Sequence, residues 1–402
     1  MKAITFAAPI PTYLVTLAAG RLSPRLLVGP HACTRHGEVA DPELPGDRWV
    51  RVGTRLGGIC GSDLAIVALA ASPATSPFSS FPFVIGHENV GVIEAIGAAV
   101  TTLRPGQRVV VNPLLACAAR AIDPPCAACR AGAPSRCEHF TDGALAPGML
   151  IGTTRGLGGS WGERFVAHET QVHVVPDTVS DEGAVLAEPF ACCVHAVRAA
   201  LPAAGERVLV IGAGSIGLLT VAALHALAPG AAITVVARHG FQGEHATRLG
   251  AARVLTGRPD ARALAEAAGA RLLATVIGPP AAVGGFDRAF VCVTGARAMD
   301  DALRFTRAGG TITLLGNARH LDGLDWTPLW MKELVLRGSV TYGAHPGAGG
   351  DAFAEALALI ASGRAPVAPL VTHTFPLAEH ARALAAAMGK ADAKSVKVAF
   401  RF

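Results

Sequence analysis

Aromatic and charged side chains are both scarce in this 402-residue chain. Aromatic residues make up 5% of it and charged residues 16%, whereas 51% of the residues are apolar. A chain of this length can form two domains of ordinary size, each with its own core. Because aromatics are few, we expect these cores to consist mainly of Ala, Val, Leu and Ile.

Long apolar runs and blocks of basic charge are missing as well. No stretch reaches the roughly 20 apolar residues that span a bilayer, and the run Tyr13–Ala19 is far shorter. Met1–Phe6 lacks the layout of a secretory signal. The net charge is +5, and no Lys/Arg block with interleaved aromatics occurs. We therefore expect a soluble cytoplasmic protein with neither a nucleic-acid nor a membrane partner.

A disulfide framework is not expected either. The chain has nine cysteines, of which four fall between Cys117 and Cys137. In a chain of enzyme size, such clustering favours metal binding or catalysis over disulfide bonds. Cys33 and Cys292 are better interpreted as small buried hydrophobic residues.

The pattern of apolar residues divides the chain into two kinds of structure. The first part has short β segments between Gly/Pro-rich turns, which is typical of a compact, barrel-like β domain. From residue 182 onward, helical and βα-alternating segments predict a parallel sheet covered by helices. The expected strands are Trp49–Val52, Val90–Ile96, Arg108–Val111, Arg164–Val166, Val172–Val175, Arg207–Ile211, Ala232–Ala237, Phe286–Val293, Thr311–Leu315 and Lys397–Phe400, with a helix over Ser215–Leu227.

A glycine-rich turn connects the first of the later strands to its helix. It reads Gly212-Ala213-Gly214-Ser215-Ile216-Gly217, directly after Val208–Ile211. In such a turn the first glycine permits a tight bend, the second lets the backbone approach a pyrophosphate, and the third lets helix and strand pack closely. Because strand, turn, helix and second strand occur in order, we predict a dinucleotide site here.

The end of the second strand indicates which dinucleotide is preferred. An NAD site would carry a carboxylate there to hold the ribose 2′-hydroxyl. This strand instead ends in Ala237-Arg238-His239. Arg238 can pair with a 2′-phosphate, and His239 can assist it. We therefore predict that NADP(H) is preferred over NAD(H).

Three residues far apart in the sequence form a candidate catalytic zinc site. Cys60, His87 and Glu188 offer a thiolate, an imidazole and a carboxylate, which suit tetrahedral Zn²⁺ with one open position. Asp63 could accept the second N–H of His87 and fix its tautomer. Glu88 could bind the metal directly or replace a departing water.

A second metal site is expected in the cysteine cluster. Cys126, Cys129 and Cys137 are spaced as in closed structural zinc sites. A fourth ligand is needed, and Asp123 or Cys117 can supply it. We favour Asp123, because it precedes Cys126 by the same step that separates Cys126 from Cys129.

Taken together, these motifs resemble those of the zinc-containing medium-chain dehydrogenases/reductases, the superfamily of alcohol and polyol dehydrogenases. The similarity extends from Met1 to Lys332-Glu333. It includes Gly86-His87-Glu88-Asn89-Val90-Gly91, Pro105-Gly106-Gln107-Arg108-Val109 and Ala187-Glu188-Pro189.

The resemblance implies a fold and an assembly. We expect an α/β protein with a GroES-like β-rich catalytic domain over residues 1–190 and 345–402. A doubly wound Rossmann domain would occupy residues 191–344. The resemblance also implies homodimers or homotetramers formed through the Rossmann domains.

The resemblance implies roles for individual residues too. Cys60, His87 and Glu188 would hold the catalytic zinc, with Glu88 as an exchanging ligand. Ser62 would pass a proton to or from the substrate oxygen. The activity implied is zinc-dependent, NADP(H)-linked interconversion of an alcohol and a carbonyl compound.

Two departures from the family pattern qualify these roles. Asp123 stands where many relatives have the first cysteine of the structural site. Ala65 stands where a histidine often continues the proton route from the Ser62 position, so the proton must leave by another path.

Two other functions are consistent with parts of the pattern. One is NADPH-dependent reduction of an activated C=C or C=N bond, a route that some zinc-free relatives took. The other is non-catalytic nucleotide binding on the same fold. The complete set Cys60, His87, Glu88 and Glu188 favours the zinc enzyme over both.

Overall fold

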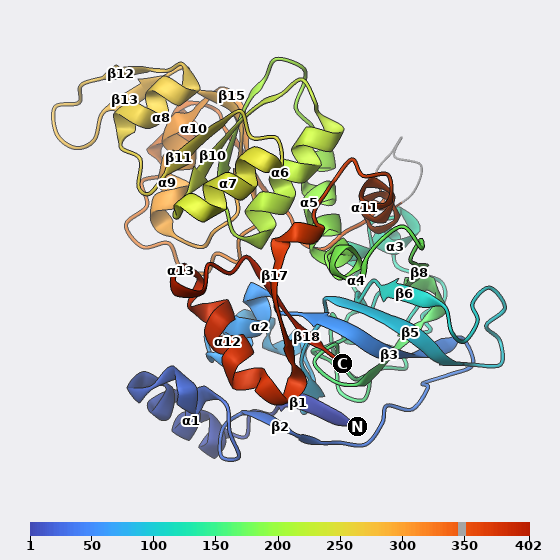
Figure 1. The fold of residues 1–402 in the computed structure, drawn as a ribbon. Coiled ribbons are helices and arrows are strands. Elements are labelled where there is room, and N and C mark those ends of the chain that lie inside the picture. The colour runs from blue at the N-terminus through green and yellow to red at the C-terminus, as the bar shows by residue number, and fades with distance from the viewer. Residues whose placement is uncertain (345–350) are drawn as a thin grey trace. The chain divides into compact units, whose positions relative to one another are not determined.

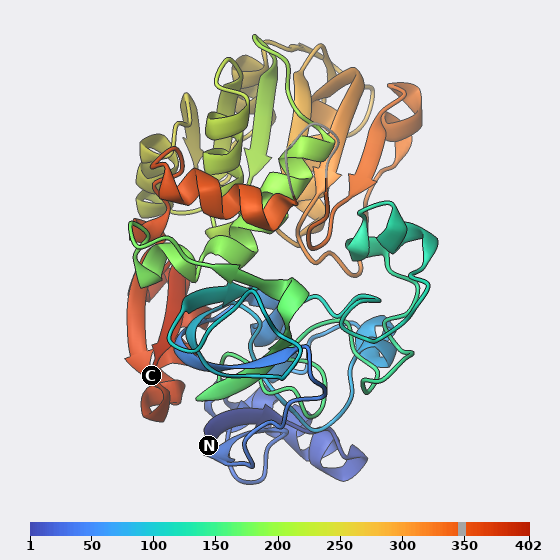
Figure 2. The same ribbon diagram turned by 90° about the vertical axis from the view of Figure 1, so that its right-hand side faces the viewer.

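The computed structural model describes residues 1–344 and 351–402 (Figures 1 and 2). The chain divides into two compact units. Unit 1 consists of Met1–Glu188, Tyr342–Ala344 and Val371–Phe402, and unit 2 of Pro189–Thr341 and the described residues of 345–370. Within the described part of the chain, no helix is long and apolar enough to cross a membrane.

Unit 1 is rich in β structure. One sheet has the order β17-β18-β3-β5-β6-β8, with β7 paired to β3, and a smaller sheet has the order β2-β1-β4. The strands are β1 (Lys2–Phe6), β2 (Thr34–Glu38), β3 (Trp49–Gly58), β4 (Phe83–Val84), β5 (Asn89–Ile96), β6 (Arg108–Val111), β7 (Arg164–His168), β8 (Val172–Val174), β17 (Val371–Pro376) and β18 (Lys397–Arg401).

The helices of unit 1 are mostly short. α2 and α3 begin directly after Cys60 and Cys126, and α5 begins in unit 1 but lies mostly in unit 2. The bounds are α1 (Ile10–Leu22), α2 (Gly61–Val67), α3 (Ala127–Arg130), α4 (Asp181–Ala184), α5 (Ala187–Ala199), α12 (His380–Met388) and α13 (Lys390–Ala393). The apolar run Tyr13–Ala19 lies in α1, a helix that the sequence analysis did not predict.

Unit 2 is a doubly wound α/β domain, as predicted. Its parallel sheet has the order β11-β10-β9-β14-β15-β16, with α6 and α7 in front of it and α9 behind in Figure 1. The elements are β9 (Arg207–Ile211), α6 (Ser215–Leu227), β10 (Ala232–Ala237), α7 (Gly240–Arg248), β11 (Arg253–Thr256), α8 (Ala261–Ala268), the hairpin β12 (Arg271–Leu273) and β13 (Ala281–Val283), β14 (Phe286–Val291), α9 (Ala296–Phe305), β15 (Thr306–Leu314), α10 (Thr327–Met331), β16 (Val335–Gly338) and α11 (Ala352–Ala361).

The boundary between the units bears on the predicted domains. The predicted change near residue 190 lies close to the division at Glu188. The predicted return at residue 345 lies outside the described residues, and residues 351–370 belong to unit 2. A physical reason is that α11 buries Phe353 and that Glu355 accepts a hydrogen bond from Arg198 of α5 at 3.1 Å.

Each unit has an apolar core of its own. In unit 1 one cluster surrounds Ile4 and Trp161, and a second surrounds Val52 and Phe165. In unit 2 a cluster around Leu209 and Phe286 fills the space between the sheet and α8 and α9.

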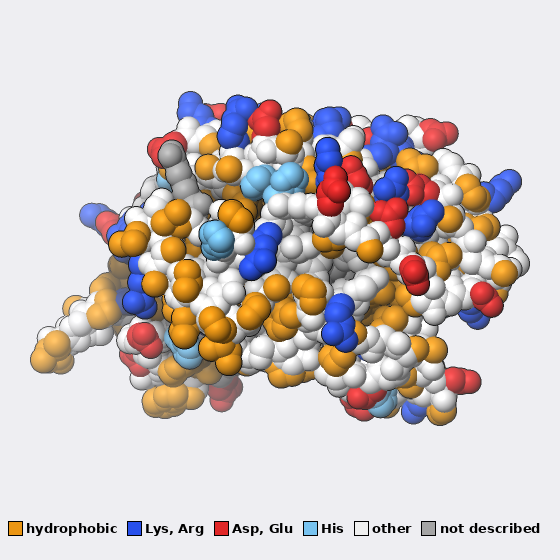
Figure 3. Space-filling model, turned by 90° about the horizontal axis from the view of Figure 1, so that it is seen from below, with side chains coloured by type: hydrophobic (Ala, Val, Ile, Leu, Met, Phe, Trp, Pro, Cys, Tyr) orange, Lys and Arg blue, Asp and Glu red, His pale blue; other side chains and the backbone are white. Residues whose placement is uncertain are grey.

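On the face drawn in Figure 3, acidic and basic side chains are interspersed.

Candidate active site

Cys60 and Asp63 are set by the first turn of α2. Cys60 is the residue that caps this helix, and its backbone N–H donates to Asp63 Oδ2 at 2.9 Å. The other carboxylate oxygen, Oδ1, lies 3.1 Å from His87 Nδ1. Asp63 is fully buried. A single carboxylate therefore fixes both the start of α2 and the ring of His87, as the spacing led us to expect for Asp63 and His87.

His87 sits in a turn that requires close backbone packing. Gly86 has φ +102°, and a Cβ there would collide with Trp161. The indole N–H of Trp161 donates to the carbonyl oxygen of Gly58 at 2.9 Å, and the side chain is fully buried. Trp161 thus packs behind the histidine turn.

Asn89 ties the same turn to the neighbouring strand. Its side-chain amide exchanges hydrogen bonds with the backbone N–H and carbonyl of Val111, each at 2.8 Å, and donates to the carbonyl of His87 at 3.1 Å. These bonds are buried, so breaking them would leave polar groups unsatisfied.

Three of the predicted ligand atoms lie close together. The donor atoms of Cys60, His87 and Glu88 are all within 4.8 Å of one another. Burial alone lowers the pKa of His87, but the charges of Asp63 and Cys60 outweigh it and raise that pKa well above its usual value. Sulfur, nitrogen and carboxylate donors at these separations fit a bound Zn²⁺.

Glu188 lies near this group but is not one of the three. It stands in the first turn of α5 and is buried. The phenol of Tyr342 donates to its Oε1 at 3.0 Å. Burial raises the pKa of Glu188 to about 7, although the nearby charge of His87 acts in the opposite direction.

Lys397 is a residue of the site that the sequence analysis missed. Its ammonium group donates to both carboxylate oxygens of Glu88, at 2.5 and 2.6 Å, and both side chains are buried. The partners are separated by 309 residues, because β18 returns to pair with β3. The available signal was a lysine within the otherwise apolar segment Val396–Phe400.

Ser62 and Ala65 lie on α2, the helix that Cys60 caps. Both are half-buried, and Ala65 follows Ser62 by three residues on the same helix. The alanine side chain has no group that can transfer a proton. A proton passed by Ser62 therefore cannot continue through the side chain at position 65.

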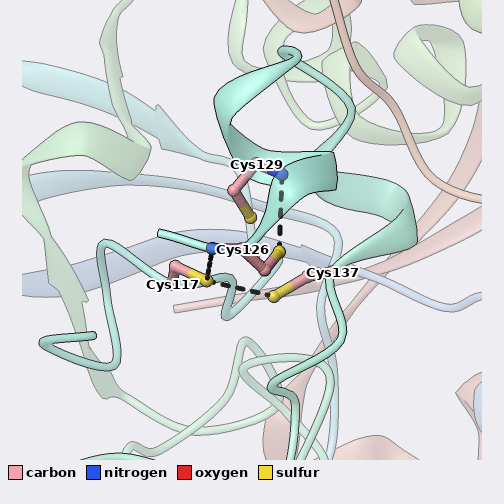
Figure 4. Close-up of side chains that lie close together, drawn as sticks. All are labelled: Cys117, Cys126, Cys129 and Cys137. Atoms are coloured by element: carbon pink, nitrogen blue, oxygen red, sulfur yellow. Dashed lines mark hydrogen bonds between the residues drawn. The ribbon is translucent and has the colours of Figure 1, made fainter. Parts of the chain in front are cut away.

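The cysteine cluster consists of four thiols (Figure 4). The sulfur atoms of Cys117, Cys126, Cys129 and Cys137 lie within 4.8 Å of one another. Among the described residues, Cys117 is the fourth member of this cluster, and Asp123 is not part of it. The equal spacing favoured Asp123, whereas the fold brings Cys117 Sγ to 3.6 Å from Cys137 Sγ.

Backbone groups surround these sulfur atoms. The backbone N–H groups of Cys126 and Cys129 donate to the sulfurs of Cys117 and Cys126, at 3.4 and 3.5 Å (Figure 4). The N–H of His139 donates to Cys137 at 3.4 Å. Such bonds favour thiolates, and hydrogen bonds from the backbone N–H groups of Glu138 and Cys129 lower the pKa of Cys126 to about 6. Four converging thiols fit a closed structural zinc site.

The dinucleotide turn lies at the end of β9. Gly212 has φ +99°, and a Cβ on Gly217 would collide with the carbonyl of Gly212. Gly214 caps α6, whose first residues are Ser215 and Ile216. The turn therefore presents a helix N-terminus at the carboxyl edge of the parallel sheet, where such sheets bind dinucleotides.

Arg238 and His239 follow the neighbouring strand β10. Arg238 is exposed. His239 is the residue before α7, and its ring stacks on that of Phe241 with 5.7 Å between the ring centroids. Since β10 pairs with β9, these two side chains lie at the same edge of the sheet as the glycine turn.

Comparison with known proteins agrees with this arrangement. A family model described as "Alcohol dehydrogenase GroES-like domain" matches residues 46–177, and one described as "Zinc-binding dehydrogenase" matches residues 215–362. The L-galactonate-5-dehydrogenase of Escherichia coli (strain K12) is 32% identical over 337 residues, covering 83% of this chain and 86% of that protein.

Other relatives extend the similarity. The L-threonine 3-dehydrogenase of Anaeromyxobacter sp. (strain Fw109-5) is 30% identical over 333 residues, covering 82% of this chain and 85% of that protein. The crystal structure of galactitol-1-phosphate dehydrogenase from Escherichia coli has the same fold, with a TM-score of 0.75, 22% identity and complete coverage of both chains. The chain therefore belongs to the zinc-containing medium-chain dehydrogenase/reductase superfamily, among alcohol and polyol dehydrogenases that act on CH–OH groups.

Proposed function

We propose that this protein is a zinc-dependent, NADP(H)-linked alcohol dehydrogenase or carbonyl reductase. The observation that carries the proposal is that the donor atoms of Cys60, His87 and Glu88 lie within 4.8 Å of one another. Asp63 already orients the ring of His87. This combination of donors supports a catalytic metal rather than a packing role, because a thiolate, an imidazole and a carboxylate are the donor types that Zn²⁺ prefers.

The residues of unit 1 would hold the metal as follows. Asp63 engages Nδ1 of His87, which leaves Nε2 as the ligand atom. Cys60 and Glu188 would complete the protein ligands, with Glu88 as the exchanging one. Lys397 balances the charge of Glu88 and would draw that carboxylate back when it leaves the metal.

Zinc, the nicotinamide and Ser62 would each contribute to the interconversion of an alcohol and a carbonyl compound. When bound, zinc supplies a Lewis acid that lowers the pKa of an alcohol, and the nicotinamide exchanges hydride with the carbinol carbon. Ser62 would transfer the alcohol proton. Because Ala65 cannot continue that route, the proton would leave through groups other than this side chain.

The dinucleotide would bind to unit 2. Gly212, Gly214, Ser215, Ile216 and Gly217 would form the pyrophosphate turn. The exposed guanidinium of Arg238, with His239 beside it, would bind the 2′-phosphate of NADP(H).

The four-cysteine loop would hold a structural zinc. We propose Cys117, Cys126, Cys129 and Cys137 as its ligands, in place of the set with Asp123. We also propose a homodimer or homotetramer formed through unit 2.

The experiment that tests the function combines metal counting with turnover. Zinc per chain would be measured by elemental mass spectrometry on protein purified without chelator or metal-affinity tag, together with NADP(H)-linked activity on a panel of alcohols and carbonyls. We expect about two zincs per chain. The Cys60→Ser variant should lose one zinc and its turnover, and retain NADPH binding.

Two outcomes would overturn the proposal. A wild-type protein with one zinc, which Cys60→Ser leaves in place, would indicate reduction of an activated double bond without metal. Tight NADPH binding without turnover on either type of substrate would indicate a non-catalytic nucleotide-binding protein.

A further inference from the structure

A three-residue segment, Tyr342–Ala344, returns from unit 2 to unit 1. It follows β16, and the residue before it, Thr341, adopts a left-handed conformation with φ 49°. The hydroxyl of Thr341 is buried and has no hydrogen-bond partner among the described residues. A β-branched residue rarely adopts this conformation, so surrounding contacts must hold the chain here.

One end of the segment reaches the candidate catalytic site. Tyr342 is 1% exposed, and its phenol donates to Glu188 Oε1 at 3.0 Å. A hydrogen bond to one oxygen of a carboxylate restricts rotation of the group and so orients it.

The other end of the segment rests on the four-cysteine loop. The backbone N–H of Ala344 donates to the carbonyl oxygen of Gly132 at 2.8 Å. Gly132 itself donates to the carbonyl of Cys129 at 3.1 Å. Gly343 fits closely against this loop, because a Cβ there would lie 3.2 Å from the Gly132 oxygen.

We propose that Tyr342 is a positioning residue for Glu188, and that the cysteine loop holds Tyr342 in place through Ala344 and Gly343. The inference rests on the proposed function, in which Glu188 is a ligand of the catalytic zinc. It adds that the state of the four-cysteine site affects the geometry of the catalytic site through one short segment.

The two carboxylates of the site have partners of different kinds. Glu88 is held by the cationic Lys397, whereas Glu188 is held by the neutral phenol of Tyr342. An ammonium ion competes with a metal for a carboxylate, whereas a phenol only orients it.

The first test removes only the hydroxyl of Tyr342. In Tyr342→Phe we expect kcat to fall about tenfold, with KM for NADP(H) unchanged, and one zinc per chain to be lost faster to a chelator. The visible spectrum of the cobalt-substituted protein should also change, since that spectrum reports ligand geometry. Tyr13→Phe, on α1, is the matched control, because tyrosine occurs at only these two positions.

The second test concerns the link to the cysteine loop. Gly343→Ala crowds the contact with Gly132 and should alter the spectrum of the catalytic cobalt in the wild-type background. In the Tyr342→Phe background the same substitution should have no further effect on that spectrum. Gly37→Ala is the control, since a Cβ there meets nothing within 4 Å.

The outcomes separate this inference from the proposed function. If the wild type is an active zinc enzyme but Tyr342→Phe retains its zinc, spectrum and kcat, Tyr342 is not a positioning residue. If Gly343→Ala changes the spectrum equally in both backgrounds, the cysteine loop does not act through Tyr342. A wild type that binds no zinc at Cys60 would remove the proposed function itself.

Discussion

At the scale of single residues, the site depends on side chains that serve two neighbours at once. Asp63 bonds both the backbone of Cys60 and the ring of His87. Trp161 fills the space behind Gly86 while its indole bonds Gly58. Such residues make local geometry cooperative, because losing one side chain releases two elements.

Arg238 provides the sharpest test of cofactor choice at this scale. Arg238→Ala removes the cation expected to pair with a 2′-phosphate, so the Kd for NADPH should rise at least about tenfold, or about 1.4 kcal/mol. The Kd for NADH, which lacks that phosphate, should change much less. Fluorescence titration with both cofactors measures this, and equal weakening would contradict the NADP(H) assignment.

Arg120 should be important for the cysteine loop. It is fully buried, and its guanidinium donates to the carbonyls of Leu115, Asp142, Leu145, Ala146 and Gly148. Arg120→Met leaves these acceptors unsatisfied, so we expect a loss on the order of 3 kcal/mol. The thermal unfolding midpoint should fall by several degrees, whereas it should stay unchanged for Arg136→Met, an exposed neighbour.

At the scale of elements, strands distant in sequence complete the site. β18 pairs with β3 and carries Lys397 to Glu88, and α5 begins with Glu188 in its first turn. The start of α2 orients Cys60 and Asp63 together. Each element contributes one or two groups, and their meeting depends on sheet pairing.

The helix α9 offers a test of pH-dependent stability. Burial outweighs the nearby guanidinium of Arg297 and raises the pKa of Asp301 to about 6. The unfolded chain ionises this carboxyl near pH 3.9, about its ordinary pKa. The free energy of unfolding should therefore fall as pH rises from about 4 to about 6, and this contribution should stay constant above pH 6.

Asp301→Asn removes this dependence. The stability of the variant relative to the wild type should increase between pH 4.5 and pH 7 by about 2 kcal/mol, the order set by the pKa difference. Thermal unfolding at several pH values measures it. Asp300→Asn, on the neighbouring and more exposed residue, is the control, and the same pH trend in both variants would refute the assignment to Asp301.

At the scale of the whole molecule, unit 2 ends in an unprotected sheet edge. β16 is the last strand of the parallel sheet and is exposed along its length, including Val335 and Leu336. Nearby, Trp330 and Met331 of α10 are about 70% exposed. Exposed sheet edges and exposed apolar side chains are often buried when subunits associate.

The proposed assembly through unit 2 predicts the effect of a charge at this edge. Leu336→Glu should shift the protein from dimer or tetramer toward monomer, because the burial of a carboxylate between two copies is unfavourable. Analytical ultracentrifugation measures the shift. Leu273→Glu, on the β12–β13 hairpin with similar exposure, should leave the mass unchanged, and a monomeric wild type would reject the interface.

Local signals in the sequence were sufficient for much of the fold. The predicted segments Arg108–Val111, Arg207–Ile211, Ser215–Leu227 and Ala232–Ala237 coincide with β6, β9, α6 and β10. Strands with apolar runs and glycine turns are specified by neighbours in sequence, so pattern alone locates them. The helix α1 was not predicted because its apolar side chains Ile10, Leu14 and Val15 are exposed, which leaves no one-sided pattern.

The amino-acid sequence specifies which chemical groups are present: the thiols, the imidazole, the glycine turn and the absence of a carboxylate after β10. Which of these groups meet depends on the tertiary structure. It placed Cys117 rather than Asp123 with the other three thiols, and it brought Lys397 to Glu88 and Tyr342 to Glu188. The reason is that these contacts join residues from 9 to 309 positions apart, and only sheet pairing and burial fix such distances.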